Sequence, residues 1–170
     1  MTIPATCPAF VVSAENYDRL MGRYLPTLAP AFADAAGIHG RARLLDVGAG
    51  PGGLTRELAR RAGAGNITAI DPSPPFVAAC RKRNPGVQVH QGVAEQLPFP
   101  DATFDATLAS LVVGFMNDPS RGLREMTRVT RPTGTVAACF WDLDHMPALG
   151  IFWTAAARYD PEVTGELRRP

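Results

Sequence analysis

The sequence lacks several features that would have pointed to a partner or a compartment. Its 17 Lys and Arg residues nearly balance its 16 Asp and Glu residues, and the net charge of +1 gives no overall field that would attract nucleic acid or anionic lipid. No uninterrupted apolar run is long enough to span a bilayer. The N-terminus has no basic stretch followed by an apolar one, so no signal peptide is predicted. We therefore expect a cytoplasmic protein with no membrane span and no nucleic-acid partner.

Cysteine is scarce as well, and its spacing excludes two kinds of small domain. Cys7, Cys80 and Cys139 lie far apart, and no pair of them forms a C-x-x-C motif. Neither a zinc cluster nor a disulfide framework is indicated, so we expect no metal site. The three thiols are predicted to be reduced and mostly buried, as in an intracellular protein.

Apolar residues, by contrast, are plentiful. Of the 170 residues, 46% are hydrophobic and 19% are charged, which suits one globular domain. Strand-like segments alternate with helix-like segments, a pattern typical of βαβ units and a parallel sheet. We expect an α/β fold, namely a Rossmann-like doubly wound parallel sheet of about five strands. The expected strands are residues 43–47, 66–71, 87–91, 104–111 and 135–141, and the expected helices are residues 17–37, 53 onward, 73–83, 119–130 and 147–159.

Two of the expected helices carry further predictions. Pro26 and Pro30 should kink or split the helix over residues 17–37, because proline lacks the backbone N–H that a helix interior needs. In the helix over residues 119–130, we expect Leu123, Met126 and Thr127 to face the core.

The most informative stretch is a glycine-rich turn between the first strand and the next helix. Glycines at positions 48, 50 and 52 allow a sharp turn and a close approach of a ligand to the main chain. The helix that follows presents unpaired N–H groups. Gly48, Gly50 and Gly53 also have the G-x-G-x-x-G spacing of dinucleotide-binding proteins, which by itself is a weak signal.

Two acidic residues distinguish between the ligands that such a turn can bind. Asp46 ends the first strand beside the turn, where a carboxylate would repel a pyrophosphate but suits a positively charged group. Asp71 ends the second strand, roughly 20 residues after the turn, where an acid can accept both hydroxyls of a ribose. A sugar is expected in either case, and Asp46 argues against a diphosphate.

At this point the sequence resembles the class I S-adenosylmethionine-dependent methyltransferases. LLDVGAGPGGLT (residues 44–55) is similar to their first motif, and ITAIDPS (residues 67–73) to the acidic end of their second strand. QGVAEQLPFPDATFD (residues 91–105) resembles a stretch of the small-molecule branch that includes quinone-biosynthesis methyltransferases. LREMTRVTRPTG (residues 123–134) is similar to the helix and turn before that branch's fifth strand. The four motifs occur in order over a little more than half of the chain.

The resemblance implies S-adenosyl-L-methionine as the cofactor and a role for each matching residue. The glycine turn should line the methionyl part, Asp46 should hold the turn and help receive the ammonium group, and Asp71 should bind the ribose hydroxyls. Pro72 should border the adenine, and Ala94 and Glu95 should meet its edge. Ser110, at the end of the fourth strand, should lie where the methyl group is presented. The implied cofactor-binding residues are Asp46, Gly48, Ala49, Gly50, Gly52, Asp71, Pro72, Ala94, Glu95 and Ser110.

The resemblance also implies a division of the chain. Residues 1–42 should form an N-terminal helical lid region, residues 43–142 the cofactor-binding core, and residues 143–170 a truncated C-terminal helical segment. Proteins of this class usually add an antiparallel strand pair after the fifth strand, and none is predicted here. The fifth strand would then have an open edge, through which we expect self-association.

The sequence thus predicts methyl transfer from S-adenosylmethionine to a small-molecule substrate by in-line displacement. Two alternatives stay open, an NAD-type oxidoreductase and a non-catalytic cofactor-binding fragment or module. No catalytic residue can be assigned. His39 and His90 lie away from the expected reaction site, and His145, which follows the fifth strand, is more simply a loop residue.

Overall fold

A computed structural model describes residues 13–142, 154–155 and 158 of the chain. Residues 1–140 belong to one compact unit and residues 141–170 to a second. The first unit contains every strand described below. Of the helix expected at residues 147–159, only Thr154, Ala155 and Arg158 are described, and they are helical; the remainder lies outside the described residues.

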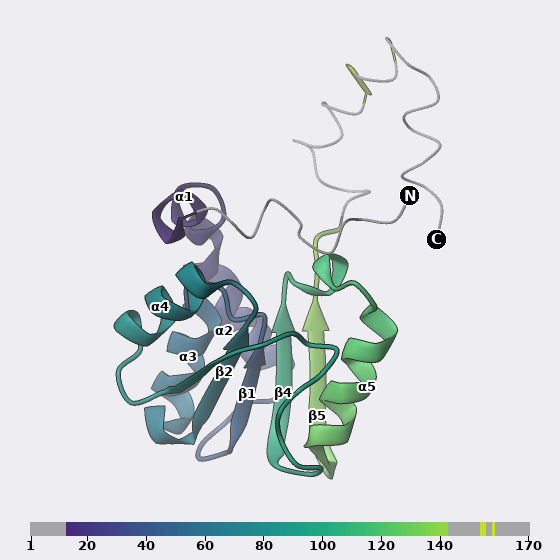
Figure 1. The fold of residues 1–170 in the computed structure, drawn as a ribbon. Helices are drawn as coiled ribbons and strands as arrows, with labels where there is room; N and C mark the ends of the chain where they lie inside the picture. Colours follow the sequence, from purple (N-terminus) through teal and green to yellow (C-terminus); the bar gives the residue numbers. More distant parts are fainter. Residues whose placement is uncertain (1–12, 143–153, 156–157, 159–170) are drawn as a thin grey trace. The chain divides into compact units, whose positions relative to one another are not determined.

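A parallel five-stranded sheet forms the centre of the first unit (Figure 1). Its strand order is β3-β2-β1-β4-β5, so the chain first builds outward to one side and then crosses to the other. All residues of β1 and β2 are buried, as expected for central strands covered on both faces. The strands are β1 (Leu44–Val47), β2 (Ile67–Asp71), β3 (Gln88–Gln91), β4 (Phe104–Ser110) and β5 (Thr130–Cys139).

Helices connect the strands, and their ends follow simple capping chemistry. Ser13 and Asp118 cap α1 and α5 through side-chain oxygens that accept backbone N–H groups. Prolines occupy the first turn of α2, α4 and α5, where no N–H partner is needed. The helices are α1 (Ala14–Leu20), α2 (Leu25–Ala35), α3 (Gly53–Ala62), α4 (Pro74–Arg83) and α5 (Pro119–Val129), with short 3₁₀ turns η2 (Gly22–Tyr24), η3 (Ala64–Asn66) and η4 (Val113–Phe115).

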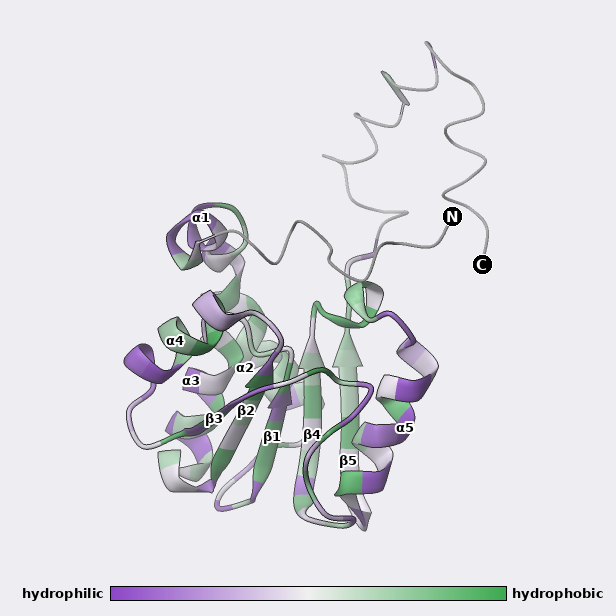
Figure 2. Ribbon diagram, in the orientation of Figure 1, coloured by the Kyte–Doolittle hydropathy of each residue, from purple (hydrophilic) through white to green (hydrophobic). Residues whose placement is uncertain are grey.

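The central strands of the sheet are packed on both faces, which makes the fold doubly wound, whereas most of β5 is exposed or partly buried. Successive residues of β1 point to opposite sides, so Leu44 packs with α2 and α3 while Leu45 packs with α5. Val77 and Cys80 of α4 pack against β2 on the same side as α3. Figure 2 shows the apolar strands and the mixed helices around them. The expected α/β fold with a Rossmann-like sheet of about five strands is thereby confirmed.

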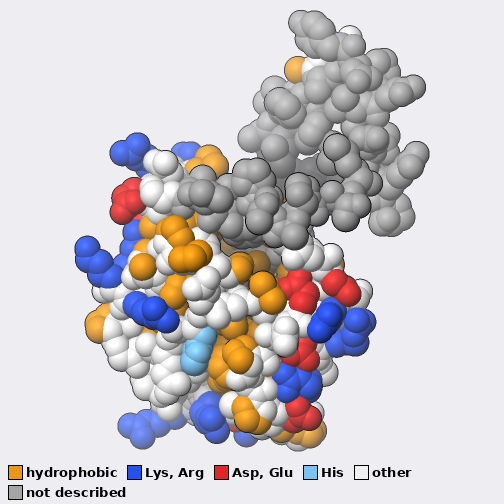
Figure 3. Space-filling view, in the orientation of Figure 1, with side chains coloured by type: hydrophobic (Ala, Val, Ile, Leu, Met, Phe, Trp, Pro, Cys, Tyr) orange, Lys and Arg blue, Asp and Glu red, His pale blue; other side chains and the backbone are white. Residues whose placement is uncertain are grey.

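The outer surface of α5 carries charges of both signs, visible together in Figure 3. Arg128 is central to this group, since its guanidinium bonds Glu125 and Asp101 as well as two backbone carbonyls. These contacts tie the helix to the loop that precedes β4. None of the helices that the structure describes is both long and apolar enough to cross a membrane.

Three sequence-based expectations about these elements need correction. The segment over residues 17–37 is split, as expected, but the break is at η2, before both prolines. Pro26 lies in the first turn of α2 and Pro30 inside that helix. β5 begins at Thr130, directly after α5, rather than at residue 135. In α5 the buried residues are Gly122, Met126 and Val129, whereas Leu123 and Thr127 are exposed. Gly122 faces inward and packs closely against Met116 and Ala94, which occupy the space that a side chain at this position would need.

Candidate functional site

The turn between β1 and α3 depends on glycine for two different reasons. Gly48, Gly50 and Gly52 all have left-handed backbone conformations, with φ of +69°, +54° and +93°. A Cβ on Gly48 would overlap Val112, and one on Gly52 would overlap the Asn84 side chain. A Cβ on Gly50 would meet only the Tyr17 ring, 3.9 Å away at Cζ. The space that a Cβ would need is therefore occupied at positions 48 and 52, whereas position 50, which is buried beneath the Tyr17 ring, has room for one.

Backbone hydrogen bonds hold the turn on the end of the neighbouring strand. The N–H groups of Gly48 and Ala49 donate to the carbonyl of Ile70 at 2.8 and 3.1 Å. Farther along, the Gly52 N–H donates to the Ala49 carbonyl, and the Asn84 amide donates to the Gly52 carbonyl. The turn is thus fixed to β2 and α4 without any ligand. Sequence reasoning missed Asn84, because nothing in its local sequence marks it as a support for a turn 32 positions away.

Asp71 lies at the carboxyl end of β2, with only 3% of its surface exposed. One carboxylate oxygen accepts the Gly50 N–H at 2.8 Å, and the other accepts the Ser73 N–H at 2.9 Å. Burial raises the pKa of the Asp71 carboxyl, and these two backbone donors oppose the rise. Each oxygen keeps a free lone pair, so the group can still accept two hydroxyl hydrogens from a diol.

Asp46 is even more enclosed, with 1% of its surface exposed. Its Oδ2 accepts the Thr55 hydroxyl at 2.6 Å, which links the end of β1 to the first turn of α3. Burial raises the pKa of Asp46 to about 7, with the Thr55 hydrogen bond opposing the rise and the Asp71 charge adding to it. The Thr55 contact explains how Asp46 holds the turn.

The two acids together define the electrostatics of the site. In the described part of the chain, neither carboxylate forms an ion pair with a basic side chain. Two buried carboxylates without a cation favour a ligand that brings positive charge, and they disfavour a diphosphate. A ligand with an ammonium group and a ribose fits Asp46 and Asp71 better than a dinucleotide does.

A residue from the N-terminal region also reaches the turn. The Tyr17 ring of α1 lies over Gly50 and packs edge-on against Phe76 of α4, with ring centroids 5.2 Å apart. Burial raises the pKa of the Tyr17 hydroxyl, and the charges of Asp71 and Asp46 add to the effect. The sequence offered no local signal for this contact beyond an aromatic residue in a helical segment.

The other implied cofactor residues have varied surroundings. The Pro72 carbonyl accepts the Gln91 amide at the end of β2. Ala94 is buried beside Leu97 in the core under α5. Glu95 does not leave its carboxylate free, because its Oε1 accepts the N–H groups of Asn117 and Asp118 at 2.7 and 3.2 Å. Glu95 therefore fixes the connection between η4 and α5.

The end of β4 contains a strained residue next to Ser110. The Ser110 hydroxyl lies 3.5 Å from the Cys139 sulfur of β5. The next residue, Leu111, has φ of +60°, a conformation that costs a branched side chain energy. This bend directs the chain across the glycine turn, where Val112 covers Gly48. The ends of β1, β2 and β4 thus meet around one site, as the resemblance implied.

Neither of the two described histidines is a candidate general base for this site. His39 is exposed before β1, as expected, and the His90 ring packs edge-on against Phe99. His145 lies outside the described residues.

Comparison with known proteins agrees with this geometry. Residues 45–138 match a family described as a methyltransferase domain. The chain belongs to this methyltransferase family. Membership implies S-adenosylmethionine as the cofactor. Its ammonium and ribose groups fit Asp46 and Asp71, which are buried and form no ion pair with a basic side chain in the described part of the chain.

Individual relatives of this methyltransferase domain are longer than the chain itself. A demethylmenaquinone methyltransferase of Chlorobaculum parvum is 37% identical over 92 residues, which cover 54% of this chain and 38% of that protein. A malonyl-[acyl-carrier protein] O-methyltransferase of Halorhodospira halophila is 34% identical over 138 residues, covering 75% and 45%. The chain thus spans less than half the length of either relative.

Solved structures support the same fold. A SAM-dependent methyltransferase from Aquifex aeolicus superposes with a TM-score of 0.69 at 21% identity, covering 80% of this chain and 77% of that one. A [4+2]-cyclase superposes with a TM-score of 0.59 at 32% identity, covering 65% and 43%. The second likeness indicates that this methyltransferase fold also occurs in a protein named for a different reaction.

Proposed function

We propose that the chain transfers a methyl group from S-adenosylmethionine to a small-molecule acceptor by in-line displacement. The observation that carries the proposal is the pair of buried carboxylates, Asp46 and Asp71, which lie at the glycine turn and form no ion pair with a basic side chain in the described part of the chain. This arrangement favours a cationic, ribose-containing cofactor over a dinucleotide.

In this proposal Asp71 accepts the two ribose hydroxyls while it keeps its bonds to Gly50 and Ser73. Asp46 faces the ammonium group and holds α3 through Thr55. Ala94 and the backbone of Glu95 border the adenine with Pro72, and the Glu95 carboxylate keeps the η4–α5 connection in place. The proposed cofactor contacts are Asp46, Gly48, Ala49, Gly50, Gly52, Asp71, Pro72, Ala94, Glu95 and Ser110.

The bound cofactor supplies an activated methyl group, so the chain's own task is alignment and exclusion of water. Tyr17 covers the turn from one side, and the bend at Leu111 brings Val112 over Gly48 from the other. Ser110 lies where the methyl group would meet its acceptor. We assign no catalytic base, which is needed only when the acceptor must lose a proton.

We infer a small apolar or amphipathic acceptor. Support comes from the nearly neutral charge of the chain and from two relatives, one named a demethylmenaquinone methyltransferase and the other a malonyl-[acyl-carrier protein] O-methyltransferase. A cytoplasmic location and the lack of a nucleic-acid partner stay predictions from composition. The division of the chain into a lid region (residues 1–42), a cofactor-binding core (43–142) and a C-terminal segment (143–170) also stays a prediction.

Calorimetry with S-adenosylhomocysteine and with NAD tests the cofactor assignment. We expect binding of the former only. Asp71→Ala should weaken that binding by about 1.5–3 kcal/mol for each hydrogen bond lost, whereas Asp101→Ala, an exposed acid before β4, should leave it unchanged. Affinity for NAD alone would refute the proposal, and an Asp71→Ala variant with undiminished affinity would refute the ribose assignment.

A second function deserves its own test, because the similar [4+2]-cyclase is named for a reaction other than methylation. The chain would then bind the cofactor without transferring its methyl group. Mass spectrometry of reactions with isotope-labelled S-adenosylmethionine and host extract distinguishes the two. A labelled small molecule supports methyl transfer, while tight cofactor binding with no labelled product supports the alternative.

A further inference from the structure

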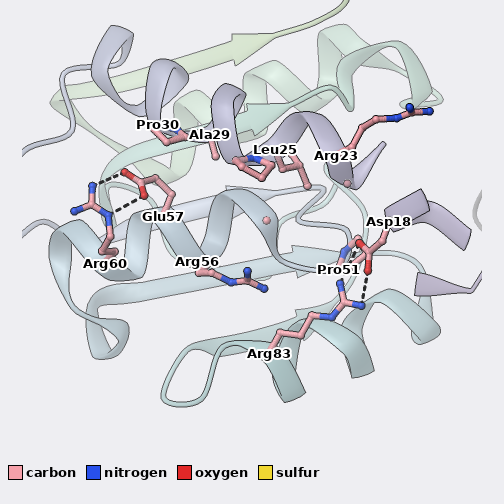
Figure 4. A pocket seen from close by; sticks show the side chains of 13 residues that line it. Asp18, Arg23, Leu25, Ala29, Pro30, Pro51, Arg56, Glu57, Arg60 and Arg83 are labelled. Atoms are coloured by element: carbon pink, nitrogen blue, oxygen red, sulfur yellow. Dashed lines mark hydrogen bonds and ion pairs between the residues drawn. The ribbon is translucent and has the colours of Figure 1, made fainter. Parts of the chain in front are cut away.

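A groove with a volume of about 620 Å³ lies beside α3 and adjoins the glycine turn, although none of the proposed cofactor contacts lines it (Figure 4). Its walls come from α1, η2, α2, the glycine turn, α3 and the end of α4. Neither Asp46 nor Asp71 lines it. Its volume lies within the range of sites that bind small molecules. The proposed methyl transfer gives this groove no role.

One side of the groove is basic. Four arginines line it, together with the two acids Asp18 and Glu57. Glu57 binds Arg60 through both oxygens, and Asp18 binds Arg83 in the same way. The other two basic residues are Arg23 and Arg56.

Those two arginines leave positive charge without a matching acid. The Arg23 side chain donates to the Leu20 carbonyl and lies over the Tyr24 ring, so its charge is not neutralised there. Arg56 forms no ion pair within the described part of the chain. The residues that line the groove therefore include four arginines and only two acids.

The opposite side is apolar and stiff. Leu25, Pro26, Ala29 and Pro30 of α2 form it, and Pro51 of the glycine turn closes one end. The ring of proline holds its shape without losing side-chain freedom on binding. Gly53 also lines the groove. It packs closely against Leu25, which occupies the space that a Cβ at position 53 would need. Figure 4 shows Leu25 across from Arg56 and Arg83, with Pro51 beside the Asp18–Arg83 ion pair.

We propose that this groove binds a small anionic amphiphile, with its carboxylate or phosphate head beside Arg56 and Arg83 and its apolar part against α2. A simple inorganic anion would leave the wall of Leu25 and Pro30 unused. A neutral apolar ligand would leave the arginines without a counter-charge. Arg83 can donate hydrogen bonds to the head group while it is paired with Asp18, because a guanidinium has five N–H donors and this pair uses two of them.

Titrations of the 170-residue chain with four probes test the chemistry of the ligand. The probes are decanoate, decyl phosphate, decanol and inorganic phosphate, each kept below any concentration at which it forms micelles. We expect the two amphiphilic anions to bind at least roughly tenfold more tightly than decanol or phosphate, in line with a charge-assisted hydrogen bond. Decanol binding as tightly as decanoate would overturn the proposal, as would equal binding of inorganic phosphate.

A matched pair of variants tests the place of binding. Arg56→Gln should weaken decanoate binding about tenfold, whereas Arg124→Gln, an exposed arginine of α5 outside the groove, should not. Arg23→Gln provides a second groove variant if the first is poorly folded by circular dichroism. Equal effects of Arg56→Gln and Arg124→Gln would contradict the assignment.

The groove and the cofactor site can also be separated. Because they share no acidic residue, decanoate should not displace S-adenosylhomocysteine, and Arg56→Gln should leave the affinity for S-adenosylhomocysteine unchanged. Direct competition between the two ligands would place decanoate in the cofactor site and overturn the proposal. If the chain proves not to transfer methyl groups, the decanoate titrations still test the groove. The proposed function and the proposed groove ligand can therefore be refuted independently.

Discussion

At the scale of single residues, we predict that Asp46 couples cofactor binding to pH. It is buried beside Asp71 with a hydroxyl as its described hydrogen-bond partner, and its pKa is raised to about 7. Ionisation at this position is unfavourable in the cofactor-free protein. A cofactor ammonium group would supply the missing positive charge and lower the pKa again.

We therefore predict proton release on binding. At about pH 6, Asp46 is largely protonated in the free protein and ionises when S-adenosylhomocysteine binds, so affinity rises with pH until about pH 7 and then levels. Calorimetry in buffers of different ionisation enthalpy measures the released proton. Asp46→Asn should reduce the number of protons released and flatten the pH dependence of the affinity. The proton release that remains would come from Asp71 and should be smaller. A wild-type protein that binds without proton release near pH 6 would contradict this.

The same carboxyl makes a prediction for the free protein. Because its pKa is higher in the folded than in the unfolded state, the folded protein loses stability as pH rises from about 4 to about 7. Asp46→Asn keeps an oxygen for Thr55 but has no charge to bury. Urea denaturation at about pH 8 should therefore find the variant more stable than the wild type, and at about pH 4 the difference should vanish.

Two glycines of the turn should separate folding from binding. Gly50→Ala places its methyl group in ordinary van der Waals contact with the Tyr17 ring and costs about 1–2 kcal/mol for the left-handed conformation. Gly52→Ala also pushes against Asn84 and Cys80, which adds about 1–3 kcal/mol. We expect Gly50→Ala to stay folded but lose affinity for S-adenosylhomocysteine, whereas Gly52→Ala should mainly lower the urea midpoint. Wild-type affinity in Gly50→Ala would remove the main chain at this position from the site.

At the scale of elements, α1 is held over the turn by two contacts with α4. Tyr17 packs on Phe76, and Asp18 forms a two-bond ion pair with Arg83, with shorter contact 2.7 Å. The ion pair is partly exposed, so its contribution is about 0.2–1 kcal/mol. This is enough to change how firmly a short helix stays in place.

We predict that Asp18→Asn lets α1 open more often and lowers cofactor affinity by a factor of about two to five. Hydrogen exchange should accelerate in α1 but not in α3. The exchanged pair, Asp18→Arg with Arg83→Asp, should recover part of the affinity. Unchanged exchange in α1, or no recovery in the double variant, would show that the ion pair does not hold this helix.

Some features of the helices and strands could be predicted from the sequence, and others could not. The strand–turn–helix around Gly48 was predictable because turn chemistry and buried strands have local signatures. The inward face of α5 was not, since Gly122 is buried by its fit against Met116 and Ala94 rather than by its own hydrophobicity. The early start of β5 likewise depends on pairing with β4, which a local pattern does not contain.

At the scale of the whole molecule, topology gathers residues that the sequence keeps apart. The carboxyl ends of β1, β2 and β4 meet because the strand order places β1 between the other two. Motifs predict Asp46 and Asp71 as cofactor contacts, and both side chains lie at the glycine turn, where Asp71 bonds Gly50 and Asp46 bonds Thr55. The contacts of Tyr17 and Asn84 and the basic groove join segments without a shared motif, so only the folded chain reveals them.

The same topology leaves β5 at one edge of the sheet, and from this we predict self-association of the 170-residue chain. Among the described strands β5 pairs only with β4, and Val136 on it is 38% exposed. Sedimentation velocity should show association that increases with concentration. Val136→Lys should suppress it, because lysine on an edge strand disfavours pairing with another chain. Leu123→Lys is the matched control, since Leu123 is 37% exposed on α5 and gains the same charge away from the edge. A monomer at every concentration, or equal suppression by both variants, would exclude the β5 edge as the contact.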